Sequence, residues 1–455
     1  MIKQFLNRTN ELETLNSRHN SDRAEFTVIY GRRRIGKSRL IDEFIEDKKG
    51  VRLLAREESE KMTLERFSSD LAEIFEDETL AQTTLPDWDS FFEYLAGKTE
   101  DDRYIIAIDE FPYIVEQNRS FPSILQDHWD SSLSNTRIFL MICGSAVSAM
   151  EDIMGHESPL YGRRTSQLLL KPISFTDIFK EIDIDIEKVI KFYSVFGGTP
   201  PYFIEADLNE TLEHNLIQKV FQYDSFLLQD TEFVLRNELK KPHFYFSILT
   251  AIAEGKTKVN KIVNHTGVER SKVGRYLSIL RDLKLVEREV PVTEEKTKSR
   301  RGIYKLSDNF FKFWFNFINP NQMLLERGKS KELADKVMEK LPRYIGPLFE
   351  DICREFVWDD YDYHEVGRWW YKENEIDIVG LKPDENKILF GECKWSEDVD
   401  PESLYYNLKE KKDEVRWNSQ NREEEFVLFA KSFQNDFTAD DLDLFDLERM
   451  ERSMK

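Results

Sequence analysis

The sequence has few cysteines, no long apolar run and a deficit of positive charge. Its three cysteines, Cys143, Cys353 and Cys393, form no C-x-x-C pair, which argues against a zinc ribbon and against a disulfide framework. No apolar run approaches the roughly 18 residues that a membrane helix needs, and the first residues lack the apolar core of a secretory signal. We therefore expect a cytoplasmic protein with no membrane segment.

The charge of the chain limits its partners. The 65 Lys and Arg residues are outnumbered by 86 Asp and Glu residues, so the net charge is -21. A field of this sign repels phosphate and argues against a protein that coats nucleic acid over its whole surface. Residues 243–306 are different, because they hold fourteen Lys and Arg against seven Asp and Glu. This basic segment is where we look for a nucleic-acid contact.

One stretch has the full G-x-x-x-x-G-K-[ST] pattern of a phosphate-binding loop, from Gly31 to Ser38. An apolar segment, residues 26–30, precedes it and an amphipathic segment, residues 39–46, follows it, which is the strand, loop and helix context that such a loop requires. Backbone N–H groups of the loop would hold the phosphates of ATP, Lys37 would reach the β- and γ-phosphates, and Ser38 would bind Mg²⁺. The residues expected to contact the nucleotide here are Gly31, Arg34, Ile35, Gly36, Lys37, Ser38 and Arg39.

A second strand ends in the carboxylates Asp109 and Glu110, the pattern of a Walker B motif. Asp109 would hold Mg²⁺ and Glu110 would polarise the attacking water. The next strand ends at Ser145, where a hydroxyl could sense the γ-phosphate, or could belong to an ordinary turn. Arg163 and Arg164 could stabilise phosphate charge, or could pair with surface carboxylates.

Several of these features together resemble the archaeal-type ATPase family, a STAND-like branch of the AAA+ and related P-loop ATPases. The resemblance rests on Arg8 and Glu11, the loop 31–38, Asp109 and Glu110, Gly144 and Ser145, Arg163 and Arg164, and the segment 197–200. It implies an ATPase core, a helical lid and a winged helix over roughly residues 1–306.

Independently of that family, residues 243–306 read as a helix-turn-helix followed by a two-stranded wing. Arg270, Lys272 and Arg275 lie near the start of the third predicted helix, where a recognition helix presents side chains to DNA. Arg300 and Arg301 lie in the wing turn and could meet phosphates. The alternative is that the winged helix serves only as a packing module.

The C-terminal part carries a second set of carboxylates. Glu350 lies on a predicted helix, Asp377 on a strand, and Glu392 and Lys394 on the next strand, where alternation places both on one face. Oxygen ligands of this kind suit Mg²⁺ or Mn²⁺ at Glu350, Asp377 and Glu392, and the lysine could orient a water. The order of these elements resembles the PD-(D/E)XK nuclease fold, although Ile376 replaces the usual proline. The alternative is a retained fold with an inactive site.

These observations predict a multidomain α/β protein. We expect a P-loop ATPase core with a parallel sheet (1–170), a helical lid (171–242), a winged helix-turn-helix (243–308), linker helices (309–342) and an α/β domain resembling restriction endonucleases (343–455). The predicted function is an ATP-hydrolysing switch that acts on DNA through the winged helix and a metal-dependent nuclease-like domain. Two alternatives stay open: a DNA-binding regulator without nuclease activity, and an ATPase that assembles with itself or with a partner protein.

Overall fold

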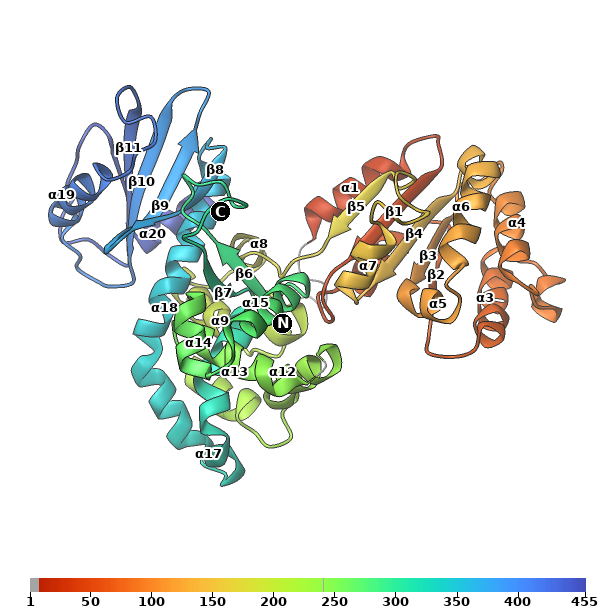
Figure 1. Cartoon of the computed structure of the whole chain (residues 1–455), viewed down its shortest axis with the longest axis horizontal. Helices are drawn as coiled ribbons and strands as arrows, with labels where there is room; N and C mark the ends of the chain where they lie inside the picture. Colours follow the sequence, from red (N-terminus) through yellow and green to blue (C-terminus); the bar gives the residue numbers. More distant parts are fainter. Residues whose placement is uncertain (1–7, 240) are drawn as a thin grey trace. The chain divides into compact units, whose positions relative to one another are not determined.

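The structure is a computed structural model that describes residues 8–239 and 241–455 (Figure 1). The first seven residues of the predicted ATPase core and Lys240 of the predicted lid lie outside the described residues. The chain forms two compact units. The first ends at Pro172 and includes Asp282–Lys284, while the second contains Ile173–Arg281 and Leu285–Lys455. The predicted lid, winged helix, linker and C-terminal domain therefore belong largely to one unit.

The first unit is built on a five-stranded sheet in the order β2-β3-β4-β1-β5, in which all neighbours are parallel. The strands are β1 (Glu25–Tyr30), β2 (Gly50–Leu54), β3 (Ile105–Asp109), β4 (Phe139–Gly144) and β5 (Ser166–Leu169). The α-helices are α1 (Thr9–His19), α2 (Lys37–Ile45), α3 (Glu60–Ile74), α4 (Trp88–Lys98), α5 (Phe111–Gln117), α6 (Phe121–Ser131) and α7 (Val147–Ile153). Helices cover both faces of such a sheet, which explains why its central strands β3 and β4 are largely apolar runs.

Buried aromatic side chains hold this sheet to its helices. Val28 and Ile106 lie in one core cluster with Phe67, Phe91 and Phe121 from the helices. The strand order places β4 between β1 and β3, so the segments that follow these three strands meet at one edge of the sheet. The core thereby fixes where the predicted phosphate loop and the predicted Walker B carboxylates lie.

The second unit begins with helices and continues into a three-helix arrangement with a small sheet. Its first helices are α8 (Phe175–Lys180), α9 (Ile186–Phe196), α10 (Pro200–Ile204), α11 (Leu212–Asn215) and α12 (Phe226–Glu238). The winged helix consists of α13 (Pro242–Ala253), α14 (Val259–Thr266), α15 (Arg270–Asp282) and the antiparallel pair β6 (Val286–Glu289) and β7 (Ile303–Leu306). Short helices, α16 (Asn309–Phe313) and α17 (Gln322–Glu326), follow it.

One long helix, α18 (Ser330–Asp360), replaces the boundary that we predicted at Pro342. Pro342 and Pro347 both lie inside it. Each proline removes one backbone donor, but the helix buries a continuous apolar stripe that includes Leu341, Ile345 and Phe349, and this packing maintains it through both positions. Although α18 spans 31 residues, neither it nor any other helix of the described residues is apolar enough over a sufficient length to cross a membrane.

The C-terminal part is a mixed five-stranded sheet in the order β12-β11-β10-β9-β8 (Figure 1). Its elements are β8 (Glu365–Tyr371), β9 (Asn374–Lys382), β10 (Lys387–Lys394), α19 (Pro401–Lys412), β11 (Glu423–Ala430), β12 (Leu442–Phe445) and α20 (Leu447–Met454). The pairs β8–β9 and β9–β10 are antiparallel, while β10–β11 and β11–β12 are parallel. Strands β8 and β9 form a hairpin, in which Lys372 adopts a φ of 52°.

Candidate nucleotide and metal sites

The loop Gly31–Ser38 joins β1 to α2 and has the backbone that a phosphate cradle needs. A Cβ atom at Gly31 would lie 2.6 Å from the carbonyl oxygen of Leu170, so only glycine fits there. Gly36 caps α2 with a φ of 93°, in the left-handed region. The amine of Lys37 donates to the carbonyl oxygens of Gly31 at 2.8 Å and Arg32 at 2.9 Å. The lysine is therefore held over the loop, at the position where phosphates would be bound.

Asp109 lies at the end of β3, opposite the start of α2. Its buried carboxylate accepts a hydrogen bond from the Ser38 hydroxyl at 2.7 Å. A hydroxyl and a carboxylate are hard oxygen donors, and together with the glycine cradle they fit Mg²⁺ and a phosphate. Arg52 on β2 also contacts this carboxylate at 3.2 Å and pairs with Asp42 at 2.6 Å. Burial would lower the pKa of Arg52, but Asp42 and Asp109 outweigh it and raise that pKa.

Glu110, the predicted catalytic carboxylate, follows Asp109 with a φ of 54°. A non-glycine residue in this region carries backbone strain, which is typical of functional positions. The Ser145 hydroxyl donates to Glu110 Oε2 at 2.9 Å, and the Ser145 backbone N–H donates to the same oxygen at 3.2 Å. The structure therefore brings the predicted catalytic and sensor residues together at the ends of β3 and β4.

The remaining predicted nucleotide residues have other partners. The guanidinium of Arg163 pairs with Asp130 at 2.8 Å, and Arg164 donates to the carbonyl oxygen of Met154 at 3.0 Å. Arg39 pairs with Glu43 on the same helix at 3.4 Å. These contacts place neither Arg163 nor Arg164 against the Lys37 amine or the Asp109 carboxylate.

Arg8, part of the family resemblance, supports the loop from behind. It donates to the carbonyl oxygen of Ile35 at 2.9 Å and to that of Lys171 at 2.8 Å, and it pairs with Glu11 at 3.0 Å. Arg34 adopts a φ of 67° within the same loop. The start of α1 is thereby tied to the phosphate loop.

On the winged helix, the predicted DNA contacts fall into two groups. Arg270, Lys272 and Arg275 are exposed on α15; Arg270 donates to Asn260 Oδ1 at 2.6 Å, and Lys272 pairs with Glu269 at 2.7 Å.

The two predicted DNA contacts in the wing turn have different surroundings. Arg300 is exposed. Arg301 donates to the carbonyl oxygen of Trp370 at 3.0 Å, lies 5.2 Å from the ring centre of Tyr371, and pairs with Glu294. Arg301 therefore joins the wing to the C-terminal sheet.

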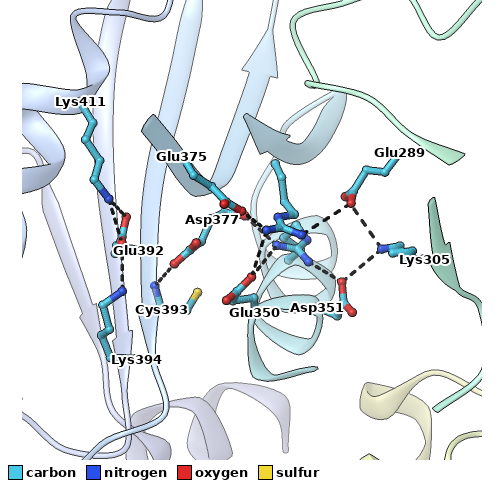
Figure 2. A network of polar contacts seen from close by, with 12 residues as sticks. Glu289, Lys305, Glu350, Asp351, Glu375, Asp377, Glu392, Cys393, Lys394 and Lys411 are labelled. Atoms are coloured by element: carbon cyan, nitrogen blue, oxygen red, sulfur yellow. Dashed lines mark hydrogen bonds and ion pairs between the residues drawn. The ribbon is translucent and has the colours of Figure 1, made fainter. Parts of the chain in front are cut away.

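In the C-terminal part, an irregular strand pairing sets the position of Asp377. The pairing passes from Gly367 with Val379 to Trp369 with Ile376, so β9 contains one extra residue beside Asp377. Such a bulge redirects a side chain. Among the described residues, carboxylate oxygens of Glu350, Glu375 and Asp377 come within 4.8 Å of one another (Figure 2). We call these three residues the carboxylate cluster.

Glu392 has other partners than the carboxylate cluster. The amine of Lys394 is 3.0 Å from Glu392 Oε1, and the amine of Lys411 on α19 is 3.1 Å from both oxygens of the same carboxylate (Figure 2). Asp377 instead accepts the backbone N–H of Cys393 at 3.0 Å. The four predicted nuclease-like residues are therefore divided: Glu350 and Asp377 meet with Glu375, while Glu392 and Lys394 meet with Lys411.

The carboxylate cluster is partly buried, and this affects its protonation. Burial, followed by the charge of Asp377, raises the pKa of Glu350 to about 7. Burial and the charge of Glu392 likewise raise the pKa of Asp377. Two arginines approach the cluster: Arg354 lies 4.0 Å from Glu350 Oε2, and Arg368 lies 3.9 Å from the same oxygen.

Five residues of these sites were not found from the sequence: Arg52, Arg354, Arg368, Glu375 and Lys411. Two of them had a signal. Arg52 is a lone charge within a strand of a parallel sheet, and Glu375 precedes Asp377 by two residues, on the same face of a strand. Arg354, Arg368 and Lys411 had no such signal, because one basic residue among many does not reveal its partner.

Three parts of the chain match known families. Residues 5–206 match a family described as an ATPase domain predominantly from Archaea, and residues 247–288 match bacterial regulatory proteins of the arsR family. Residues 314–421 match a family of archaeal and bacterial proteins of unknown function. The predictions of an archaeal-type ATPase domain and of a helix-turn-helix are thereby confirmed, and the nuclease resemblance stays a prediction.

Individual proteins extend these matches. The Walker-type ATPase of Pyrococcus abyssi superimposes with a TM-score of 0.50 at 19% identity, over 69% of this chain and 96% of its own, which shows the fold alone. An uncharacterized ATP-binding protein of Methanocaldococcus jannaschii is 48% identical over 48 residues, 10% of this chain and 81% of that protein. An uncharacterized protein of the same organism is 32% identical over 455 residues, 98% of this chain and 99% of that protein. The chain belongs to the family of this last protein, and its N-terminal unit is an ATPase domain of the predominantly archaeal type.

Proposed function

We propose that the protein is an ATP-hydrolysing switch that acts on DNA through its winged helix and its C-terminal carboxylates. The observation that carries the first part is the meeting of Lys37, Ser38, Asp109 and Glu110 at one edge of the parallel sheet. A phosphate cradle, two magnesium donors and a carboxylate for the attacking water are the parts that phosphoryl transfer to water requires.

Each residue has a separate task in this reaction. Bound Mg²⁺ would offset phosphate charge beside Ser38 and Asp109. Lys37 would exchange its carbonyl partners for phosphate oxygens, as its position over the loop allows. Glu110 would leave Ser145 to accept a proton from water, and the freed Ser145 hydroxyl would donate to phosphate. The Glu110–Ser145 hydrogen bond is therefore the contact that should change with nucleotide.

ATP turnover by purified protein tests this part. Lys37→Ala should abolish turnover, because it removes the amine that is held over the loop by the carbonyl oxygens of Gly31 and Arg32. Lys49→Ala is a matched control, because Lys49 lies just before β2, at the end of the sheet away from the phosphate loop. Its one described ion pair is with Asp102 at 3.3 Å. Turnover retained in Lys37→Ala would sink the ATPase assignment.

The DNA part rests on the exposed basic side chains of α15. Val273, Leu277 and Leu280 bury one face of this helix, so Arg270, Lys272 and Arg275 occupy the opposite, exposed face. Changing Arg270 and Arg275 to Ala should weaken DNA binding and reduce its salt dependence by roughly two counterions. Lys336→Ala, which removes an exposed charge from α18, is the control. Equal affinity in the double variant would contradict the DNA interface.

The nuclease part rests on the carboxylate cluster and on Lys394, which lies on β10, the strand that pairs with β9. Its oxygens suit Mg²⁺ or Mn²⁺, and the buried Glu350 Oε2 accepts no hydrogen bond from the described residues. Lys394, whose side chain is 43% exposed, could neutralise a scissile phosphate. Asp377→Ala and Lys394→Ala should each remove Mg²⁺- or Mn²⁺-dependent cleavage of DNA.

A second candidate is a regulator that binds DNA without cutting it. It is favoured by cations that already meet the C-terminal carboxylates: Arg354 and Arg368 lie at Glu350, and Lys394 and Lys411 lie at Glu392. Absence of cleavage by the unmodified protein on single- and double-stranded DNA and RNA, with ATP and Mn²⁺ present, would favour this candidate. A mass measurement with and without ATP would show whether the switch acts through self-assembly or a partner protein.

A further inference from the structure

Arg368 on β8 lies among carboxylates from three different elements. Its guanidinium contacts Glu375 on β9, lies 3.9 Å from Glu350 Oε2 on α18, and lies 3.8 Å from Glu289 on the wing strand β6. Two of these three carboxylates belong to the carboxylate cluster. A cation of the protein itself therefore already stands at the place where a divalent cation would be attracted.

The guanidinium balances charge without completing the hydrogen bonds of the cluster. Glu350 Oε2 is buried and accepts no hydrogen bond from the described residues, and Arg368 Nε and a buried oxygen of Glu289 have no hydrogen-bond partner there either. A divalent cation would bind carboxylate oxygens directly, at about 2.0–2.6 Å. The cluster is therefore neutralised but not saturated.

The wing fixes the position of Arg368. The backbone N–H of Val292, which follows β6, donates to the carbonyl oxygen of Arg368 at 2.9 Å. Glu289 attracts the guanidinium from the wing side, and Lys305 on β7 lies 3.9 Å from the same carboxylate. If the guanidinium moved towards Glu289, it would lose its contacts with Glu350 and Glu375 and expose their carboxylates. If it moved away from Glu289, it would continue to cover them.

We propose that Arg368 is an internal counter-cation that a divalent cation must displace, and that the wing carboxylate Glu289 sets how readily this happens. The inference rests on the proposed metal-dependent function of the carboxylate cluster. Like charges about 4 Å apart in a partly buried site repel strongly, so a guanidinium and a divalent cation cannot occupy the same carboxylates. Occupancy of the site is thereby linked to the winged helix.

Mn²⁺ binding to the full chain without nucleotide tests this, with free Mn²⁺ followed by electron paramagnetic resonance. Binding that is lost in Asp377→Asn is assigned to the cluster. Arg368→Gln should raise the affinity of that binding about tenfold or more, Arg368→Lys should leave it close to the original value, and Glu289→Gln should lower it two- to threefold. Arg449→Gln, which breaks a surface ion pair with Asp443, is the matched control and should change nothing.

Each outcome decides one point. Equal Mn²⁺ affinity in the original protein and in Arg368→Gln would overturn the counter-cation role, and unchanged affinity in Glu289→Gln would overturn the part of the wing. If Arg368→Gln is folded by circular dichroism yet shows no Mn²⁺ binding that depends on Asp377, the metal site itself fails and the proposed nuclease function with it.

Discussion

Glu350 provides a sensitive test of how the carboxylate cluster is balanced. Its pKa rises from an ordinary 4.5 to about 7, first because it is buried and second because Asp377 lies beside it. The folded protein therefore holds this proton more tightly than the unfolded chain does. The resulting stability is fully present below about pH 4.5 and is lost as pH rises through about 7.

The size of the effect follows from the shift. A difference of roughly 2.5 pKa units at about 1.36 kcal/mol per unit gives an upper limit near 3 kcal/mol. Because the Glu350 side chain is 19% exposed and shares its charge with Asp377, we expect about 2 kcal/mol. Glu350→Gln keeps the shape of the protonated side chain and cannot ionise. At pH 8 it should be more stable than the original protein by about 2 kcal/mol, and at pH 5 this gain should fall to below about 1 kcal/mol, because the unfolded-state carboxyl is then only partly ionised.

Urea unfolding in EDTA between pH 5 and pH 8, followed by tryptophan fluorescence, measures this difference. Trp369 and Trp370 lie on β8, the strand that pairs with β9, so part of the signal of the eight tryptophans reports on the relevant sheet. Glu339→Gln, an exposed position on the same helix as Glu350, is the matched control and should show no pH-dependent gain. A Glu350→Gln protein that is less stable than the original at pH 8, or one with the same gain at both pH values, would refute the reasoning.

Three further changes should have distinct effects. Glu110→Gln should keep ATP affinity but lower turnover at least a hundredfold, because it removes the proton acceptor for water; ATP-binding and steady-state assays separate the two. Gly31→Ala should weaken ATP binding more than tenfold, since its new methyl group would lie 2.6 Å from a backbone oxygen; Gly97→Ala, with no atom within 4 Å, should not. Lys411→Met should lower the free energy of unfolding by about 1–2 kcal/mol, because both of its contacts are to the buried Glu392. Lys394→Met should lower the free energy of unfolding by less. If the nuclease proposal holds, only Lys394→Met of these two variants should remove cleavage.

The nucleotide site was predictable because its chemistry depends on local sequence. Glycines at fixed spacing, a lysine, and a strand that ends in Asp109 specify their own surroundings, and the parallel sheet then brings the ends of its strands together. The helix-turn-helix was predictable for a similar reason, since Val273, Leu277 and Leu280 repeat at helical spacing.

The carboxylate cluster was only half predictable. Alternation along a strand indicates which residues share a face, but the extra residue in β9 depends on pairing with β8, which leaves no mark in the sequence. The continuation of α18 through Pro342 could not be predicted for a similar reason, because tertiary packing outweighs the local cost of a proline. The tight turn at Lys372 was equally hard to predict, because its position of positive φ holds neither glycine nor asparagine.

Each unit has an acidic site that carries an arginine of its own, and the two arginines should respond differently to metal. A buried carboxylate without a counter-charge costs several kcal/mol, and Arg52 and Arg368 supply that charge at Asp109 and at the carboxylate cluster. Mg²⁺ usually keeps several waters and binds proteins through one or two groups, so Asp109 can hold a hydrated ion and Arg52 at the same time. In the cluster, three carboxylates converge within 4.8 Å, and an ion bound directly between them leaves no room for a guanidinium. If both sites bind metal as we propose, binding at the ATPase site would follow the nucleotide alone, whereas binding at the cluster would require Arg368 to move.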